Sequence, residues 1–223
     1  ATILESKRVA AVRTIENARF FALDPAYVDK AALGGVLMAS LSWNAAGPLA
    51  SGHDTAEGLT TAGFAALKRM EAKGMAIDVS HLNDRCFDEV ASSTDAPLVA
   101  SHSNSRAVCG APRNLTDAQF DCIRERGGLV GLNFCCGFLR ESGEPTFDDI
   151  SRHIDRWLER DGEDAIALGS DFDGCDTPRC IASAADMPAF QNLLRARFGE
   201  TITAKLCGLN ALRFFSRRIP ATL

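Results

Sequence analysis

Two histidines follow two neighbouring apolar runs, and each histidine is preceded by a serine. Ser80-His81 comes after MAIDV, and Ser101-His102 comes after PLVA. Between them lies NDRCFDEVASS, a predicted helix with Asn83 as its N-cap. The pattern therefore predicts strand, helix and strand, with an imidazole at the C-terminal end of each strand. In parallel α/β proteins, ligands and catalytic groups collect at that edge of the sheet.

Carboxylates take the same position in two other predicted strands. Glu16 follows VAAVRTI and Asp171 follows AIALGS, so a parallel sheet would bring both to the face that carries the histidines. Two histidines and a carboxylate are a common ligand set for a catalytic zinc ion that keeps one position open for water. We therefore predict a metal site formed by Glu16, His81 and His102. Asp171 would take or steer a proton, or bind a substrate ammonium group.

Three other side chains are weaker candidates. Arg113, in APRN, could hold a carboxylate with its bidentate fork, although a surface arginine near a turn explains it equally well. His53 lies in the loop AAGPLASGHDTAEG and is expected to be exposed. His153 lies inside a predicted helix, where a packed or helix-surface role is expected. Either metal-site histidine taken alone would also be more typical of a structural role, and only their joint placement favours a metal.

The elements that must position these residues alternate regularly. Helix-like segments at about 18–35, 59–74, 83–93, 117–128 and 147–162, and two more at 187–198 and 202–217, accompany six strand-like runs. The runs end at Glu16, Trp43, His81, His102, Phe134 and Asp171. This order predicts an α/β fold with a parallel sheet and right-handed crossovers. A (β/α)8 barrel needs eight such units and about 250 residues, so the sequence predicts a TIM-barrel type with only about six units present.

Composition excludes several function classes. A chain of 223 residues with 46% hydrophobic residues is expected to form one domain over 1–223. A net charge of -5 with scattered Lys and Arg gives no basic patch for nucleic acid, which favours a small-molecule or peptide ligand. No apolar run approaches the roughly 20 residues that span a bilayer, and we expect a cytoplasmic location. The eight cysteines form no CxxC pair, so reduced thiols are favoured over a disulfide framework.

Four segments together resemble a known family. DVSHLND, ASHSNSRAVCGAPRNLTDAQ, GGLVGLNF and GSDFDG, in this order and spacing, closely resemble the renal or membrane dipeptidases. These are the M19 metallopeptidases of the amidohydrolase-like barrels, and the resemblance runs from about Val9 to Phe215. It implies a binuclear zinc site on a (β/α)8 barrel that hydrolyses dipeptides, including some with a D-residue at the C-terminal side.

The resemblance also implies roles for individual residues. Glu16 matches the carboxylate that bridges the two metals, so it is a catalytic residue as well as a ligand. His81 and His102 match the ligands of the second zinc. Arg113 matches the residue that holds the C-terminal carboxylate of the substrate. Asp171 matches the acidic residue near the substrate amino group and the transferred proton.

Two departures from the family pattern change the expectation. Nothing before Glu16 resembles the His-x-Asp motif that supplies ligands to the first zinc, so the domain is expected to be N-terminally truncated relative to the family. Trp43 stands where many members have a histidine that contacts the substrate carbonyl, and indole places its single donor elsewhere. We expect one zinc per chain and impaired dipeptidase activity. The open sheet edges have three explanations: the chain is a fragment of a longer gene product, it is a short paralogue that forms a homodimer to cover the edges, or its first units are missing from the sequence.

Two alternative functions remain open. One is a degenerate member that binds metal or peptide without turnover, which the absence of the His-x-Asp motif favours. The other is an amidohydrolase that acts on another amide, an ester or a lactone, which Trp43 favours. A panel of dipeptides, esters and lactones would separate the dipeptidase from the second alternative.

Overall fold

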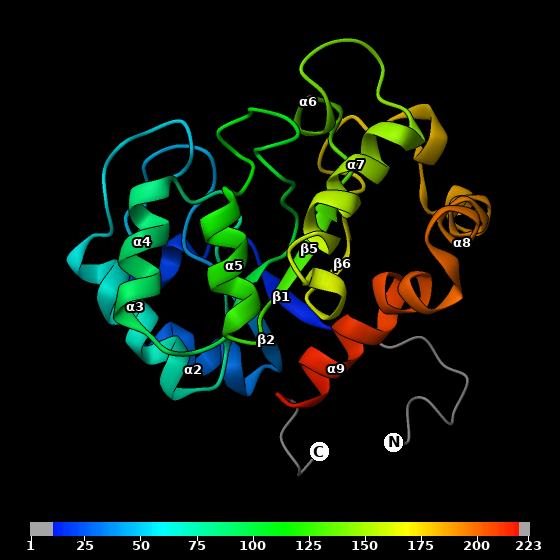
Figure 1. Ribbon diagram of the computed structural model, residues 1–223. Coiled ribbons are helices and arrows are strands. Elements are labelled where there is room, and N and C mark those ends of the chain that lie inside the picture. Colours follow the sequence, from blue (N-terminus) through cyan, green and yellow to red (C-terminus); the bar gives the residue numbers. More distant parts are fainter. Residues whose placement is uncertain (1–10, 219–223) are drawn as a thin grey trace.

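A single parallel sheet organises the molecule. The computed structural model describes residues 11–218, and its six strands are hydrogen-bonded in chain order, each parallel to the next. The sheet curls into a half-barrel with helices on its outer side (Figure 1). The six predicted strands and the partial TIM-barrel fold are therefore confirmed. The strands are β1 (Arg13–Ile15), β2 (Val36–Ser40), β3 (Ala76–Asp78), β4 (Leu98–Ala100), β5 (Leu129–Asn133) and β6 (Ile166–Ser170).

Helices connect the strands and continue after the last one. The α-helices are α2 (Ala26–Leu33), α3 (Thr61–Ala72), α4 (Asp84–Ser93), α5 (Asp117–Glu125), α6 (Cys136–Leu139), α7 (Phe147–Leu158), α8 (Met187–Ala204) and α9 (Asn210–Ser216). Short 3-10 segments are η1 (Arg19–Ala22), η2 (Gly162–Asp164), η3 (Arg179–Ile181) and η4 (Ala184–Asp186), and η5 (Lys205–Leu209) is a π-helix.

Side-chain caps set the starts of the central helices. Asn83 accepts a hydrogen bond from the Cys86 N–H at 2.8 Å, which satisfies a free donor at the start of α4. Thr116 and Gln119 form the predicted capping box of α5. Because α4 and α5 start directly beyond the His81 and Arg113 loops, these caps also fix where those loops end.

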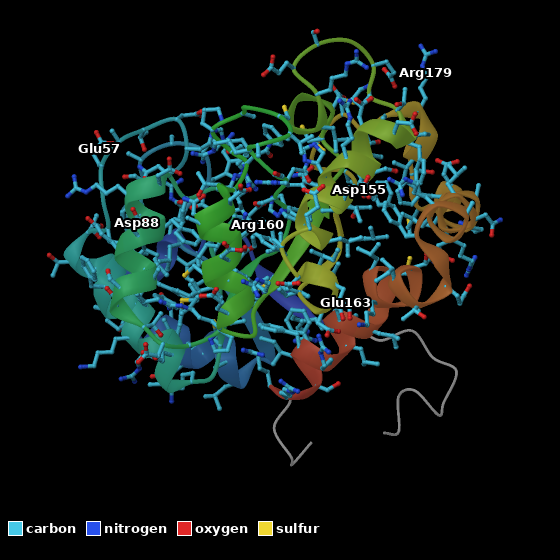
Figure 2. All side chains as sticks on the ribbon, viewed as in Figure 1. Glu57, Asp88, Asp155, Arg160, Glu163 and Arg179 are labelled. Atoms are coloured by element: carbon cyan, nitrogen blue, oxygen red, sulfur yellow. The ribbon has the colours of Figure 1, made fainter. Side chains whose placement is uncertain are left out.

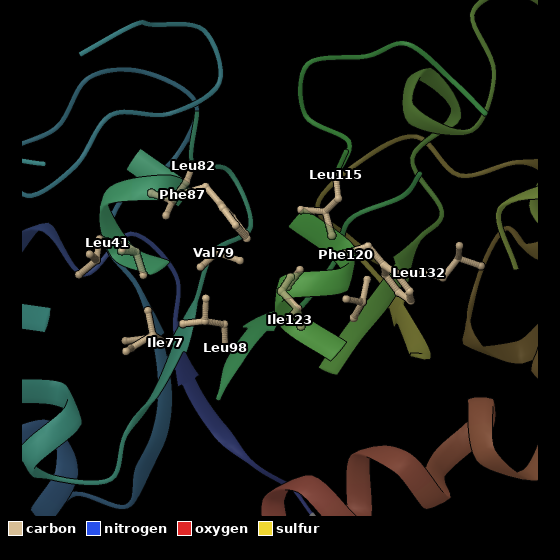
Figure 3. Packing of buried hydrophobic residues seen from close by; sticks show 14 of the residues in the cluster. Leu41, Ile77, Val79, Leu82, Phe87, Leu98, Leu115, Phe120, Ile123 and Leu132 are labelled. Atoms are coloured by element: carbon tan, nitrogen blue, oxygen red, sulfur yellow. The ribbon is translucent and has the colours of Figure 1, made fainter. Parts of the chain in front are cut away.

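The core has two layers, one on each face of the sheet. On the outer face, Ile77 and Leu98 pack beneath α4 and α5, as Figure 3 shows. The Phe120 and Trp157 rings stack with their centroids 5.4 Å apart, which joins α5 to α7. On the inner face, Phe214 of α9 packs with a smaller cluster of strand side chains: Met38, Ala76, Val99, Leu129 and Ala167. Helix α9 therefore fills the N-terminal end of the half-barrel.

Three predicted elements differ from the structure. The segment predicted as one helix at 18–35 splits into η1 and α2, because Pro25 cannot continue a helix that precedes it. Strand β2 ends at Ser40, so Trp43 lies in the following loop and not at the strand end. The predicted helix at 202–217 is interrupted by the π-helix η5, where Gly208 has a non-helical φ of 173°.

Charged side chains cover the outer surface, as Figure 2 shows. Several of them pair between neighbouring elements: Arg160 with Asp121, Arg197 with Asp155, and Lys205 with Glu163. Water screens such exposed pairs, so they orient helices more than they stabilise them. Within residues 11–218, no helix has the length and apolar character that a bilayer crossing requires.

Candidate metal centre

Glu16, His81 and His102 meet at the C-terminal edge of the sheet. Their ligating atoms all lie within 4.8 Å of one another. The Glu16 Oε1 atom lies 2.9 Å from His81 Nε2 and 3.5 Å from His102 Nε2. The two Nε2 atoms are themselves 2.9 Å apart. The structure thus brings together the three side chains that the sequence predicts as metal ligands, from the ends of β1, β3 and β4.

Backbone geometry delivers these side chains to one point. The Asn17 N–H donates to Ser40 Oγ at 2.8 Å, which ties the residue after Glu16 to the end of β2. His81 has a φ of 69°, in the left-handed region that residues other than glycine rarely adopt. Such a conformation is retained where the surroundings enforce it, as at functional sites. Here it turns the imidazole toward Glu16.

The partner of His81 Nδ1 fixes its tautomer. Nδ1 lies 2.8 Å from the Asn44 Oδ1 acceptor, so Nδ1 carries the proton and Nε2 presents a lone pair. Arg113 Nε lies farther from the same nitrogen, at 3.3 Å, so the amide contact is the one that sets the tautomer. A histidine that donates its remote N–H in this way is oriented as a metal ligand.

His102 is oriented by a chain of two hydrogen bonds. The Ser101 hydroxyl donates its single proton to Asp78 Oδ2 at 2.5 Å. It can therefore only accept at His102 Nδ1, which lies 2.7 Å away. The Asp78 carboxylate is itself held by the Ser80 and Ser101 N–H groups, each at 3.0 Å. His102 Nδ1 thus carries the proton, and its Nε2 presents a lone pair as well.

The lone pairs of Glu16 Oε1, His81 Nε2 and His102 Nε2 then face one another, and neither Nε2 atom carries a proton. Burial lowers the pKa of both His81 and His102, which favours neutral rings. Two neutral imidazoles and one carboxylate with converging lone pairs are stabilised by a cation between them. The residues present therefore fit a divalent metal ion.

Arg113 lies beside this centre with an unsatisfied donor. Its side chain is 4% exposed, and burial lowers its pKa to about 10. Nη1 donates to Ser103 Oγ at 2.7 Å, whereas Nη2 is buried without a partner. A buried donor without a partner costs about 1–3 kcal/mol. The guanidinium is thus held in place and has a free N–H for an anionic ligand.

Asp171 lies at the same edge, beyond β6. Its Oδ2 accepts from Asn133 Nδ2 at 3.2 Å, which links it to the end of β5. Its φ is 66°, and Ser170 and Asp173 also have positive φ. The turn after β6 is therefore held in an unfavourable conformation that aims the carboxylate, as at the end of β3.

The loop after β2 supplies the remaining wall. The Trp43 ring centroid lies 6.1 Å from that of His81, and the indole is 52% exposed. His53 Nε2 lies 3.0 Å from Asn44 Oδ1, and its side chain is only 13% exposed. The expectation that His53 is exposed was wrong, because the loop folds over the strand ends and packs His53 against Asn44.

His153 and Arg106 have structural roles near the site. His153 is fully buried, accepts from the Ser105 N–H at 3.1 Å and donates to the Leu139 carbonyl at 3.1 Å. It packs as predicted, and it joins the loop after β4 to α6. Arg106 donates to both carboxylate oxygens of Asp84 at 2.8 Å and to the Asn114 carbonyl at 2.7 Å. It clamps the loop that carries Arg113.

Sequence reasoning missed the orienting residues Asn44, Asp78 and Ser101. A usable signal existed for Asp78, since a charged residue inside the apolar run MAIDV must have buried partners. Ser101 directly precedes His102, which also marks it. Asn44 lies in an irregular loop, and nothing in the local sequence shows that its amide reaches His81.

Comparison with known proteins identifies a family whose sequences match this chain. Residues 1–219 match the membrane dipeptidase family, peptidase family M19. A protein encoded in the pqqA 5' region of Klebsiella pneumoniae is 40% identical over 222 residues, covering 94% of this chain and 82% of that protein. These matches extend over nearly the whole chain.

Two solved structures have the same fold. A metallo peptidase from Rhodobacter sphaeroides, liganded with a phosphinate mimic of the dipeptide L-Ala-D-Ala, has a TM-score of 0.86 and 37% identity over 93% of this chain. The dipeptidase AC, also of family M19, has a TM-score of 0.90 and 36% identity over 99% of this chain. The chain covers 63% and 69% of these two proteins.

Proposed function

Because the chain belongs to the membrane dipeptidase family, peptidase family M19, we propose that it is a zinc-dependent dipeptidase. The observation that carries this proposal is the pairing of a metal-ligand cluster with a buried, partly unsatisfied arginine. Glu16, His81 and His102 form the cluster, and Arg113 Nη2 is the free donor beside it. A metal beside a carboxylate-binding donor suits a substrate with a peptide bond close to a free C-terminus.

The ligand set supports zinc over harder cations. Two imidazoles and one carboxylate, with room for water, are typical of catalytic zinc, whereas calcium and magnesium prefer oxygen ligands alone. When bound, the metal would polarise the scissile carbonyl and lower the pKa of a water molecule. Glu16, His81 and His102 would hold it, and Asn44 and Ser101 would keep the two rings in the ligating tautomer.

Arg113 would select the substrate by its C-terminal carboxylate. Nη2 is unpaired and Nη1 is held by Ser103, so the guanidinium can receive a carboxylate without moving. Charge-assisted hydrogen bonds of this kind are about twice as strong as neutral ones. Esters and lactones without a carboxylate would leave the donor unpaired, which favours dipeptides over those substrates.

Asp171 would act on the other end of the substrate. Its carboxylate lies close enough to Arg113 for the two charges to interact. Only its Oδ2 has a side-chain hydrogen bond among the described residues, so Oδ1 is available to accept from an ammonium group or to carry a proton. The half-exposed Trp43 would flank a substrate side chain and influence which dipeptides fit. The bound L-Ala-D-Ala mimic in the Rhodobacter sphaeroides relative supports testing dipeptides with a C-terminal D-residue.

The test combines metal analysis with a matched substrate pair. Purified protein reconstituted with zinc is assayed on L,L- and L,D-dipeptides and on the same dipeptides with an amidated C-terminus. We expect turnover of the free acids, and a strong loss on amidation in the wild type but not in Arg113→Gln. Equal turnover of acids and amides by the wild type would contradict the role of Arg113. Bound zinc without any turnover would instead support the degenerate, non-catalytic member.

A further inference from the structure

Two half-buried cysteines lie side by side at the rim of the candidate site. Cys135 follows β5 and Cys175 follows β6. The two segments are hydrogen-bonded to each other, because the Cys136 N–H donates to the Asp176 carbonyl at 2.9 Å. This hydrogen bond holds the segments that carry the two cysteines side by side beyond the strand ends.

The two cysteines also share a neighbour. The Cys135 N–H donates to Asn133 Oδ1 at 2.6 Å, and Cys175 Sγ lies 4.0 Å from the same oxygen. The two thiols lie close enough for Cys135 to act on Cys175. Both thiols are free in the structure, so the contact is one between two reduced groups.

The two thiols differ in their surroundings. Burial raises the pKa of Cys175, and its Sγ donates to the Asp171 carbonyl at 3.5 Å, so it stays protonated. The thiolate is the form that reacts with oxidants. Because Cys175 stays protonated, Cys135 would react first and Cys175 would follow.

We propose that Cys135 and Cys175 form a reversible disulfide on exposure to hydrogen peroxide, and so make a redox modification site at the rim of the metal centre. The Cys135 thiolate attacks the peroxide oxygen and becomes a sulfenic acid, while hydroxide leaves. The Cys175 sulfur then attacks that sulfenic sulfur; the S–S bond forms, and the Cys175 proton leaves with the hydroxyl as water. Two thiols are oxidised, and one peroxide is reduced to two waters.

The disulfide would act on the site through Asp171. Cys175 Sγ gives up its contact with the Asp171 carbonyl when it bonds to Cys135. Asn133, which holds Asp171 Oδ2 at 3.2 Å, loses its thiol neighbour at the same time. The turn after β6 would shift, and with it the carboxylate. The change in activity rests on the proposed dipeptidase function, whereas the cross-link itself does not.

Peptide mapping tests the cross-link without any assay of activity. The reduced full chain is treated with hydrogen peroxide, its free thiols are blocked and it is digested with trypsin. Cys175 is the single cysteine of peptide 161–179, and Cys135 lies in peptide 127–140. We expect these two peptides joined, with a mass loss of about 2 Da for the two hydrogens removed, and separated again by dithiothreitol.

Variants distinguish this pair from its neighbour. Cys136 lies in the same peptide as Cys135, so Cys136→Ser is the matched control and should keep the cross-link. Cys135→Ser and Cys175→Ser should each abolish it. A cross-link that survives in Cys135→Ser, or oxidation of Cys135 to the sulfinic acid with no cross-link in the wild type, would overturn the proposal.

Hydrolysis of dipeptides then tests the consequence. Peroxide should lower turnover by the wild type, dithiothreitol should restore it, and Cys175→Ser should keep its turnover under the same treatment. If the cross-link forms but no dipeptide is hydrolysed before treatment, the proposed function fails while the modification site stands. A cross-link that forms and leaves turnover unchanged would overturn its coupling to the site.

Discussion

At the scale of single residues, the candidate ligands depend on side chains that do not reach the metal. The Ser101 hydroxyl donates its proton to Asp78, so it can only accept from His102 Nδ1 and thereby orients that ring. Asn44 orients the other ring, because its Oδ1 accepts from His81 Nδ1; the same oxygen also contacts His53. Each ring would otherwise be free to present the wrong nitrogen. The buried polar groups around the site are thus explained by the ligands they hold.

Ser101→Ala removes the acceptor at His102 Nδ1 while it leaves the three ligands in place. We expect zinc affinity to fall by about 10–100-fold, as is typical when the partner of a ligating histidine is lost. Competition with a fluorescent zinc chelator measures the affinity. Ser92→Ala, on the exposed face of α4, is the control. Unchanged affinity in Ser101→Ala would show that the Asp78 chain does not orient the ring.

His153 makes stability depend on pH. Burial lowers its pKa to about 4 from an ordinary value of 6.5, so the unfolded chain takes up a proton well before the folded chain does. Above pH 6.5 the titration of His153 therefore does not change the free energy of unfolding. As the pH falls from 6.5 to 4, the free energy of unfolding decreases. The loss is about 3 kcal/mol over this range.

Urea unfolding at a series of pH values measures this effect. His153→Gln should unfold more easily than the wild type at neutral pH, because its hydrogen bonds to Ser105 and Leu139 are altered. Its stability should nevertheless change less between pH 6.5 and 4. A parallel decline in both proteins would assign the acid sensitivity to other groups.

At the scale of elements, the strands β5 and β6 carry facing glycines that make room for the site. A Cβ on Gly131 would lie 2.0 Å from the Ser101 carbonyl oxygen, and one on Gly169 would lie 2.1 Å from it. The Ser103 N–H also donates to the Gly131 carbonyl at 2.8 Å. The backbone on both sides of His102 thus rests against strands that are free of side chains at this point.

Gly131→Ala should therefore disturb both the sheet and the metal centre. We expect a loss of about 1–3 kcal/mol in unfolding free energy, because the added methyl group forces the Ser101 backbone away. Zinc affinity should fall as well, since His102 moves with it. Gly137→Ala is the control, because a Cβ there meets nothing within 4 Å. Equal unfolding free energies of the two variants would mean that the Ser101 backbone accommodates the added methyl group without loss of stability.

The elements that the sequence predicted well are those with a local cause. Apolar runs marked all six strands, and Asn83 and Thr116 marked two helix starts because capping involves residues three apart. The break at Pro25 also has a local cause, but the apolar pattern on both sides masked it. The short helix α6 has no local signal, whereas Gly208 marks the π-helix η5.

The candidate site also contains residues that the sequence predicted and residues that it could not predict. Glu16, His81, His102 and Asp171 follow strands, and the parallel topology brings such residues to one edge without knowledge of any contact. Asn44 and the thiol pair come together only through loops whose path depends on tertiary packing. Sequence alone therefore located the donors and could not show which tautomer or which partner each one has.

At the scale of the whole molecule, the metal centre joins β1 to two strands with which it does not pair. Glu16 follows β1, whereas His81 and His102 follow β3 and β4. Strand β1 is paired on one side with β2, and its residues are exposed or half-buried. A metal ion held by all three side chains would fasten β1 to the centre of the sheet. One domain over 1–223 and a homodimer stay predictions.

Zinc should therefore stabilise the folded chain, with one ion per chain at this centre. Residues 11–218 contain one cluster of three converging ligands, and an ion that binds only the folded state adds about 2.7 kcal/mol at a concentration 100 times its Kd. Elemental analysis gives the stoichiometry, and thermal unfolding with zinc and with a chelator gives the stabilisation.

Glu16→Gln provides the sharpest control for this linkage, because it keeps the shape of the side chain and removes the charge that the cation needs. The half-exposed carboxylate lies at the surface of the centre, so the variant should fold like the metal-free wild type and respond weakly to zinc. If the variant gains as much thermal stability from zinc as the wild type does, the ion does not bridge β1 to the histidines. Two tightly bound ions per chain would require ligands beyond this cluster, and the expectation of a single metal would then be wrong.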